Sequence, residues 1–321
     1  MSPDIKRQAL GFAERAGLVN QLGRHIASRF PKIVRVDPFT PEFQTAFRGL
    51  TDDGGVPLLV FGHFNHMDPI VGAHLCKGLV DLSKEGDPKK QLNGFVATLA
   101  KSVKEGKQSP LLKGLYPTME AYANLRSVEF VEITREVDVR RYGMKKDRAE
   151  IDLLKARVKR EGVGVVILAG GTVQPGRHPE GKKGDDIFGL KKLEDGDTDI
   201  TSMFAVMGRW GRDLNQYPYF VPVGINRTYR FLSSDSLMMT PEGIASIYDR
   251  PWKILSLLGI ERMFVDIKVG MPLMAEDMAG SLGTDWRNNP NEINNLLMRR
   301  VALLLPPNAR GEFSNLTSSG S

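Results

Sequence analysis

The chain has 321 residues, of which 41% are hydrophobic and 26% are charged, with one cysteine and a formal net charge of +6. This apolar content excludes a mainly disordered chain, and the length allows one large α/β domain or two smaller domains. The single cysteine, Cys76, excludes a disulfide scaffold and a cysteine-rich zinc site. Because the chain also lacks a signal-peptide pattern, we expect a cytoplasmic protein.

The positive charge predicts an anionic partner, such as a phosphate group, an acidic carrier protein or an anionic lipid. Nucleic acid is not expected, because the sequence has no zinc-finger, helix-turn-helix or aromatic RNA-binding signature. No apolar run approaches the roughly 20 residues that a membrane-spanning helix needs. Any membrane contact is therefore expected to be peripheral, at the cytoplasmic face.

Residues 1–30 are predicted to form an amphipathic helical segment. Apolar residues recur at helical spacing from position 3 to position 30, with lysines and arginines between them. Two interpretations stay open. The segment packs on the protein's own core, or it lies on an anionic membrane surface.

Short apolar runs then alternate with helical patterns along the chain. The predicted strands cover residues 58–61, 95–99, 128–134, 163–168, 219–225 and 264–269. The predicted helices cover residues 69–82, 110–125, 145–160 and 292–305. This alternation predicts an α/β domain over residues 31–305, with a mixed, mainly parallel central sheet and helices on both faces. Residues 306–321 are expected to form a flexible tail.

The first candidate site lies at the end of strand 58–61. His63 follows that strand, and Asp68 precedes Pro69, the expected first residue of the next helix. Open α/β sheets bind ligands at the carboxyl ends of their strands. We expect Asp68 to cap the helix and to accept the Nδ1 proton of His63, which leaves Nε2 as a base. The plainer alternative is a capping aspartate beside an incidental histidine.

A metal site is not expected in this segment. His63, His66 and Asp68 do not reproduce the H-x-H-x-D-H pattern of one large class of metallo-hydrolases. On a passage from strand to loop, the two histidines would also not share one face.

Four blocks carry a resemblance to a known family. Segment 60–69 (VFGHFNHMDP) resembles the H-x4-D signature of the glycerol-phosphate and lysophosphatidate acyltransferase superfamily. Segment 128–135 (VEFVEITR) resembles that family's strand ending in arginine, and segment 166–172 (VILAGGT) its strand before F-P-E-G-T-R. Segment 220–225 (FVPVGI) resembles the V-P-V-A/G-I strand that lines the pocket. Pro222 favours this match, because proline is unusual in a central strand.

The third block departs from the family pattern. Gly170 stands in place of the glutamate and Val173 in place of the arginine, whereas Gly171 and Thr172 match. The nearest arginine is Arg177. This glycine-rich version is closer to the soluble plastid-type glycerol-phosphate acyltransferases.

The resemblance implies an acyltransferase that moves a fatty acyl group from a thioester on coenzyme A or acyl carrier protein to a hydroxyl. Glycerol-3-phosphate and lysophosphatidate are the expected acceptors, and no further cofactor is implied. His63 would act as general base, with Asp68 orienting it. Backbone amides of Gly170 and Gly171 would stabilise the oxyanion. The acceptor or its phosphate would be bound by Arg135, Arg177, Lys101 and Thr172.

Other functions stay open. The changed third block motivates an N-acyltransferase that uses the same His63 and Asp68 on an amine or amino acid. A catalytically silent lipid-binding member of the fold is a further alternative, against which the intact pair argues. A serine hydrolase is not expected, because the G-x-S-x-G elbow is missing. Cys76 is not expected to be a nucleophile.

Overall fold

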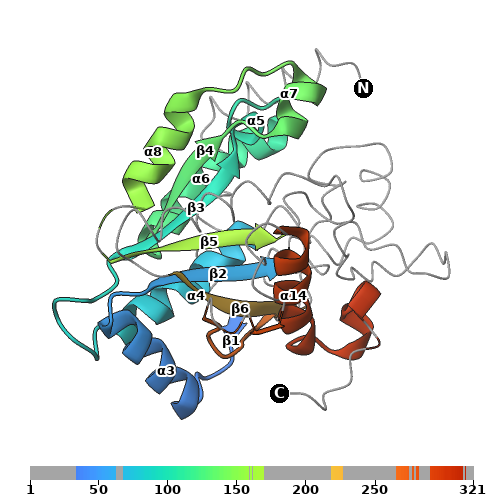
Figure 1. Ribbon diagram of the computed structural model, residues 1–321. Helices are drawn as coiled ribbons and strands as arrows, with labels where there is room; N and C mark the ends of the chain where they lie inside the picture. The colour runs from blue at the N-terminus through green and yellow to red at the C-terminus, as the bar shows by residue number, and fades with distance from the viewer. Residues whose placement is uncertain are drawn as a thin grey trace, which may run out of the picture.

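A computed structural model describes residues 34–62, 68–158, 160, 162–169, 218–226, 265–274, 277, 280, 281, 290–313 and 315. These residues form a seven-stranded sheet with the order β1-β7-β6-β2-β5-β3-β4 (Figure 1). The strands are β1 Val34–Val36, β2 Val56–Gly62, β3 Gly94–Ala100, β4 Val128–Ile133, β5 Val163–Ala169, β6 Pro218–Asn226 and β7 Val265–Val269. All pairings are parallel except β6 with β7. The predicted mixed, mainly parallel sheet is therefore confirmed.

Helices cover both faces of this sheet. The described helices are α3 Pro41–Asp52, α4 Asp68–Ser83, α5 Lys101–Lys104, α6 Pro110–Leu125, α7 Glu136–Tyr142, α8 Arg148–Val158 and α14 Pro290–Leu303. One face packs against α3, α4 and α6, and the other against α8 and α14. No helix within the described ranges is long and apolar enough to cross a membrane.

Strand β2 explains why two cores form. Its side chains alternate, so that Leu59 and Phe61 join the core on the α4 face, whereas Leu58 and Val60 join the core on the α14 face. All four side chains are fully buried. A strand buried on both faces reads as a continuous apolar run, as this segment does.

Proline in the central strand β6 is accommodated by a break in its pairing with β7. Val223 pairs with Val269, but Phe220 bridges to Leu273, so the β7 side carries one extra residue. The carbonyl of Pro222 accepts the N–H of Gly270 at 2.9 Å, which places that residue's polar groups on the β7 side. Pro222 has no backbone N–H to donate, and this gap lies on the β7 side, where the pairing is irregular. The parallel pairing of β6 with β2 is therefore kept.

Several boundaries differ from the sequence predictions. Helix α4 begins at Asp68 rather than at Pro69. Helix α8 begins at Arg148 rather than at residue 145, because the Asp147 carboxylate accepts the N–H of Ala149 at 2.9 Å and caps the helix there. The short elements β1, α5 and α7 and the longer helix α3 were not predicted.

Pro307–Ala309 and Gly311–Phe313 form 3-10 helices, and Phe313 is buried in the core beside α14. Residues 307–313 therefore pack on the domain and do not form a flexible tail, because the side chain of Phe313 anchors them. The predicted helical segment 1–30 lies outside the described residues.

Candidate functional site

The carboxyl ends of β2 and β5 lie side by side. These strands are parallel neighbours, and their register pairs Gly62 with Ala169 (Figure 1). Gly62 immediately precedes His63, and Ala169 immediately precedes Gly170. The predicted site residues His63, Gly170, Gly171, Thr172 and Arg177 themselves lie outside the described residues.

Asp68 is described, and its side chain is fully buried at the start of α4. The first turn of a helix favours negative charge, because the helix dipole and the unpaired amide groups point there. Helix α4 packs against the sheet through Val71, Leu75 and Leu79, all fully buried. This packing fixes the aspartate at the same sheet edge at which β2 ends.

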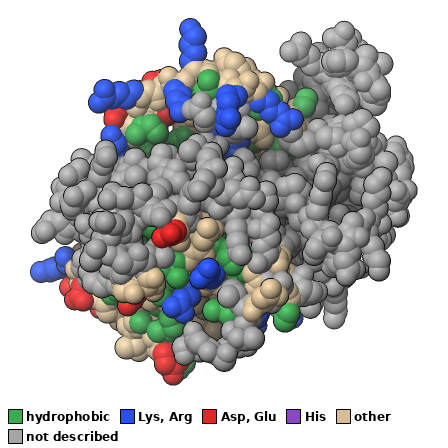
Figure 2. Space-filling view, turned by 45° about the vertical axis from the view of Figure 1, so that its right-hand side comes forward, with side chains coloured by type: hydrophobic (Ala, Val, Ile, Leu, Met, Phe, Trp, Pro, Cys, Tyr) green, Lys and Arg blue, Asp and Glu red, His purple; other side chains and the backbone are tan. Residues whose placement is uncertain are grey.

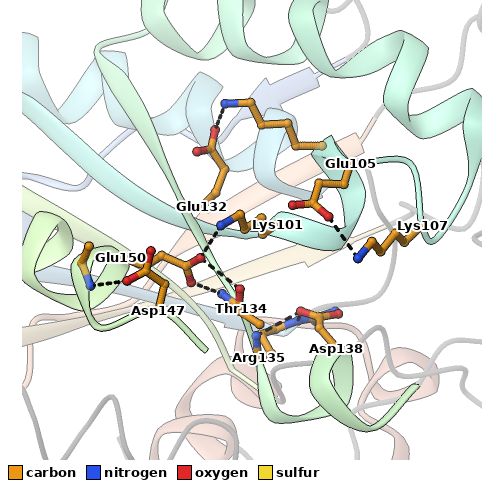
Figure 3. A network of polar contacts seen from close by, with 11 residues as sticks. Lys101, Glu105, Lys107, Glu132, Thr134, Arg135, Asp138, Asp147 and Glu150 are labelled. Carbon is orange, nitrogen blue, oxygen red and sulfur yellow. Dashed lines mark hydrogen bonds and ion pairs between the residues drawn. The ribbon is translucent and has the colours of Figure 1, made fainter. Parts of the chain in front are cut away.

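The structure also brings Lys101 and Arg135 to this edge. Strands β3 and β4 are parallel, with Ala100 opposite Ile133, and the two cations follow these strand ends (Figure 3). Sequence analysis assigned both side chains to phosphate binding. Each of them contacts a carboxylate of this chain.

Lys101 is paired with Glu150. Its Nζ lies 2.7 Å from Glu150 Oε1, and the hydrogen bond to this carboxylate raises the pKa of Lys101. Glu150 comes from the first turn of α8, and its side chain is 11% exposed. It also accepts the N–H of Thr134 at 2.6 Å and the Thr134 hydroxyl at 3.0 Å. Glu150 therefore joins the ends of β3 and β4 to α8.

Arg135 is paired with Asp138. The Asp138 carboxylate is 0% exposed and accepts the backbone N–H of Arg135 at 3.0 Å, Nε at 3.1 Å and Nη2 at 3.2 Å. It also accepts the hydroxyl of Ser102 at 2.6 Å. Burial alone would raise the pKa of Asp138, but the bonds from Arg135 and Ser102 outweigh it and hold the pKa below its usual value.

A third carboxylate extends the network along the same edge. Glu132 contacts Lys104 Nζ at 2.7 Å and accepts the hydroxyl of Tyr116. Burial would raise the pKa of Glu132, but these two donors lower it, whereas burial and the nearby carboxylate raise the pKa of Tyr116. Sequence analysis missed all three acidic partners. Only the spacing of Arg135 and Asp138, three residues apart at a helix start, could have revealed one of them.

Cys76 is fully buried in α4, and burial raises the pKa of its thiol. Among the described residues, no group of three or more His, Cys, Asp or Glu side chains could hold a metal ion. His66, considered with His63 for a metal, lies outside the described part of the chain.

Comparison with known proteins adds no family assignment. No protein-family model matches this chain, and a search of the curated proteins finds none similar to it.

Proposed function

We propose that this protein is an acyltransferase that moves a fatty acyl group from a thioester to an acceptor hydroxyl. The donor is carried on coenzyme A or acyl carrier protein, and the acceptor is glycerol-3-phosphate or lysophosphatidate. In this proposal His63 is the general base, and Asp68 orients its imidazole. Backbone N–H groups of Gly170 and Gly171 stabilise the tetrahedral oxyanion.

The observation that carries the proposal is the pairing of β2 with β5. Gly62 lies opposite Ala169, so the H-x4-D block and the glycine-rich block leave the sheet at neighbouring positions. The two blocks are far apart in the sequence. A base and oxyanion donors must act within a few ångströms of the same thioester carbonyl, and this juxtaposition supports that arrangement.

The proposed reaction is a direct transfer. The acceptor hydroxyl gives its proton to Nε2 of His63 while its oxygen attacks the thioester carbonyl carbon. The tetrahedral oxyanion then collapses, the carbon–sulfur bond breaks, and the imidazolium returns the proton to the leaving thiolate. Asp68 accepts the Nδ1 proton of His63 in a hydrogen bond and so stabilises the imidazolium. No acyl-enzyme and no metal are required.

The ends of β3 and β4 would supply acceptor binding. The side chain of Arg135 is 20% exposed and that of Lys101 is 35% exposed, and both stand at the same sheet edge as β2 and β5. A guanidinium carries five N–H donors in a planar fork, which suits a phosphate group. Thr172 and Arg177 would add to this binding from the third block.

A second candidate is N-acylation of an amine or amino acid. One observation favours it: Asp138 and Glu150 neutralise the two described strand-end cations, Arg135 and Lys101. This edge is therefore less positive than a site built for a phosphate dianion. An acceptor with little net charge fits such an edge better.

An acceptor panel tests the proposal. The purified protein is incubated with one labelled acyl thioester and with glycerol-3-phosphate, lysophosphatidate or a set of amino acids, and products are identified by mass. His63→Ala should lower turnover by about 10²–10⁴-fold. Asp68→Asn should lose most activity as well, because it favours the wrong tautomer.

His66→Ala is the matched control and should lose much less activity. Near-normal turnover in His63→Ala would overturn the base assignment. Equal losses in His63→Ala and His66→Ala would favour a metal site instead. Binding of lipid without transfer to any acceptor would favour the lipid-binding alternative.

A further inference from the structure

Five cationic side chains lie at the end of α7, in the connection that follows it and at the first residue of α8. Within residues 140–148 the only carboxylate is Asp147, so the segment carries a net charge of +4. All five side chains are exposed; that of Arg148 is 92% exposed, and its Nε lies 3.9 Å from Oδ2 of the exposed Asp152 on α8. Figure 2 shows Lys and Arg side chains gathered at the upper end of the molecule, where Figure 1 places α7 and α8. We call this the α7–α8 basic surface, formed by Arg140, Arg141, Lys145, Lys146 and Arg148.

The connection between α7 and α8 has a defined backbone conformation. Helix α7 ends at Gly143, whose φ of 63° is a left-handed conformation that glycine adopts without strain. Met144 is buried and anchors the turn, and Asp147 caps α8 through the N–H of Ala149. The guanidinium of Arg141 lies 5.7 Å from the centre of the Tyr142 ring. The fold therefore fixes the backbone from which these five side chains project.

The α7–α8 basic surface borders the proposed active-site edge. It begins five residues after Arg135, and α7 follows the carboxyl end of β4. At the strand ends themselves, Asp138, Glu150 and Glu132 offset the cations that they contact. Among the residues described at this edge, the excess positive charge therefore comes from the α7–α8 basic surface.

We propose that the α7–α8 basic surface docks an acidic protein that carries the acyl thioester, which presents the acyl group to the adjacent sheet edge. This inference rests on the proposed acyl transfer. Charges of opposite sign steer such a partner to the surface and fix its orientation. Three of the five cations are arginines, whose planar fork pairs with carboxylates through two bonds at once.

The surface fits a protein better than a bilayer. Segments that lie in a membrane interface insert large apolar side chains between lipids. Within residues 140–148 the large apolar side chain, Met144, is buried, and Tyr142 is half-buried; the exposed Ile151 and Leu153 lie further along α8, beyond the cations. What the segment presents outward is charge at fixed spacing, which complements a folded acidic surface.

Charge reversal provides the test. The variant Arg140→Glu/Arg141→Glu is compared with the control Lys89→Glu/Lys90→Glu, which makes the same change in charge. The two lysines lie on the exposed loop before β3, at the amino end of that strand and away from the proposed active-site edge at the carboxyl ends. Two donors are used: acyl-[acyl carrier protein] and the same acyl group on pantetheine. The first variant should raise the KM for the protein-bound donor on the order of tenfold. It should leave kcat/KM for acyl-pantetheine unchanged, and the control should change neither.

A direct binding measurement separates the outcomes. Calorimetry with acyl carrier protein should show binding that weakens as salt rises and that is lost in Arg140→Glu/Arg141→Glu. Turnover of acyl-pantetheine with carrier binding unaffected by the reversal would overturn the docking proposal and leave the proposed function standing. No turnover of either donor, with carrier binding lost on reversal, would overturn the proposed function and keep the surface. Loss of binding to anionic vesicles, but not to the carrier, would identify a membrane contact and overturn the proposal.

Discussion

The hydroxyl of Ser102 donates a 2.6 Å hydrogen bond to Oδ1 of Asp138, so a residue just beyond β3 is tied to the helix that follows β4. Glu150 makes a similar connection between Lys101 and Thr134, the residues that immediately follow β3 and β4. The buried carboxylate of Asp138 and the partly buried carboxylate of Glu150 thus connect the ends of the last two strands of the sheet. These connections set the shape of the edge at which we place acyl transfer.

Replacing Asp138 with asparagine should destabilise the fold. Asparagine keeps the shape of the side chain but loses the charge that accepts from Arg135 and Ser102. Hydrogen bonds to charged groups contribute about 1.5–3 kcal/mol each, and we expect a loss of unfolding free energy in that range. Urea denaturation at pH 7 measures it. Ser102→Ala, which leaves the Arg135 pair intact, should lose less; equal losses would show that the ion pair adds nothing.

The contribution of Asp138 should depend on pH in a defined direction. Its pKa in the folded protein is lowered, so it binds a proton less readily when folded than when unfolded. Its stabilisation is then complete above the ordinary aspartate pKa of about 3.9 and is lost as the pH falls below that value. The difference in unfolding free energy between wild type and Asp138→Asn should therefore shrink between pH 7 and pH 3. A difference that stays constant would contradict the assignment.

The sequence was sufficient to predict the fold class but not the order of its strands. Continuous apolar runs such as Leu58–Phe61 and β-branched runs such as 163–168 identify buried strands, because a strand covered on both faces is apolar at every position and these runs are too short for helices. The short helix α7 has only seven residues, too few to show an apolar period. Helix α3 does show one, since Phe43, Phe47 and Leu50 recur at helical spacing. It also has a recognisable start, because the Thr40 hydroxyl accepts the N–H of Phe43 and Pro41 follows Thr40.

The candidate site could be predicted only in part. The predicted strands 95–99 and 128–134 end close to Lys101 and Arg135, and in the structure both residues follow the carboxyl ends of β3 and β4. Their partners could not be predicted from the same patterns, because the contact between Lys101 and Glu150 depends on how β3, β4 and α8 pack together. The adjacency of β2 and β5 likewise arises from a crossover that no local pattern specifies.

Arg135→Ala should distinguish the two proposed acceptor classes. If the acceptor carries a phosphate, its KM should rise on the order of tenfold, with the donor KM nearly unchanged, because a charge-assisted bidentate contact is lost. Steady-state kinetics with each substrate varied in turn measures this. An unchanged acceptor KM would favour N-acylation of an acceptor without phosphate. Thermal unfolding should accompany the kinetics, since the variant also removes the partner of Asp138.

Deletion of residues 1–30 should test the predicted membrane contact. If this segment lies on lipid, the full chain should float with anionic vesicles, bind neutral vesicles weakly, and dissociate as salt rises. The deleted form should then stay at the bottom of the gradient while remaining folded by circular dichroism. Flotation of both forms to the same extent would place the contact elsewhere, and flotation of neither would favour a segment packed on the protein.

Gly72→Ala should show how closely α4 must approach β2. A Cβ at Gly72 would lie 2.5 Å from Cζ of Phe61, and both residues are buried. The ring cannot move away easily in a packed core, so α4 must shift, at a cost of about 1–3 kcal/mol in unfolding free energy. Because α4 begins with Asp68, acyl transfer should also slow at temperatures where the variant remains folded. Gly49→Ala on α3 is the matched control: it is exposed, nothing lies within 4 Å of the new Cβ, and we expect a gain of about 0.5–1 kcal/mol. If Gly72→Ala unfolded like wild type and kept full activity, close packing of α4 on Phe61 would not be what positions Asp68.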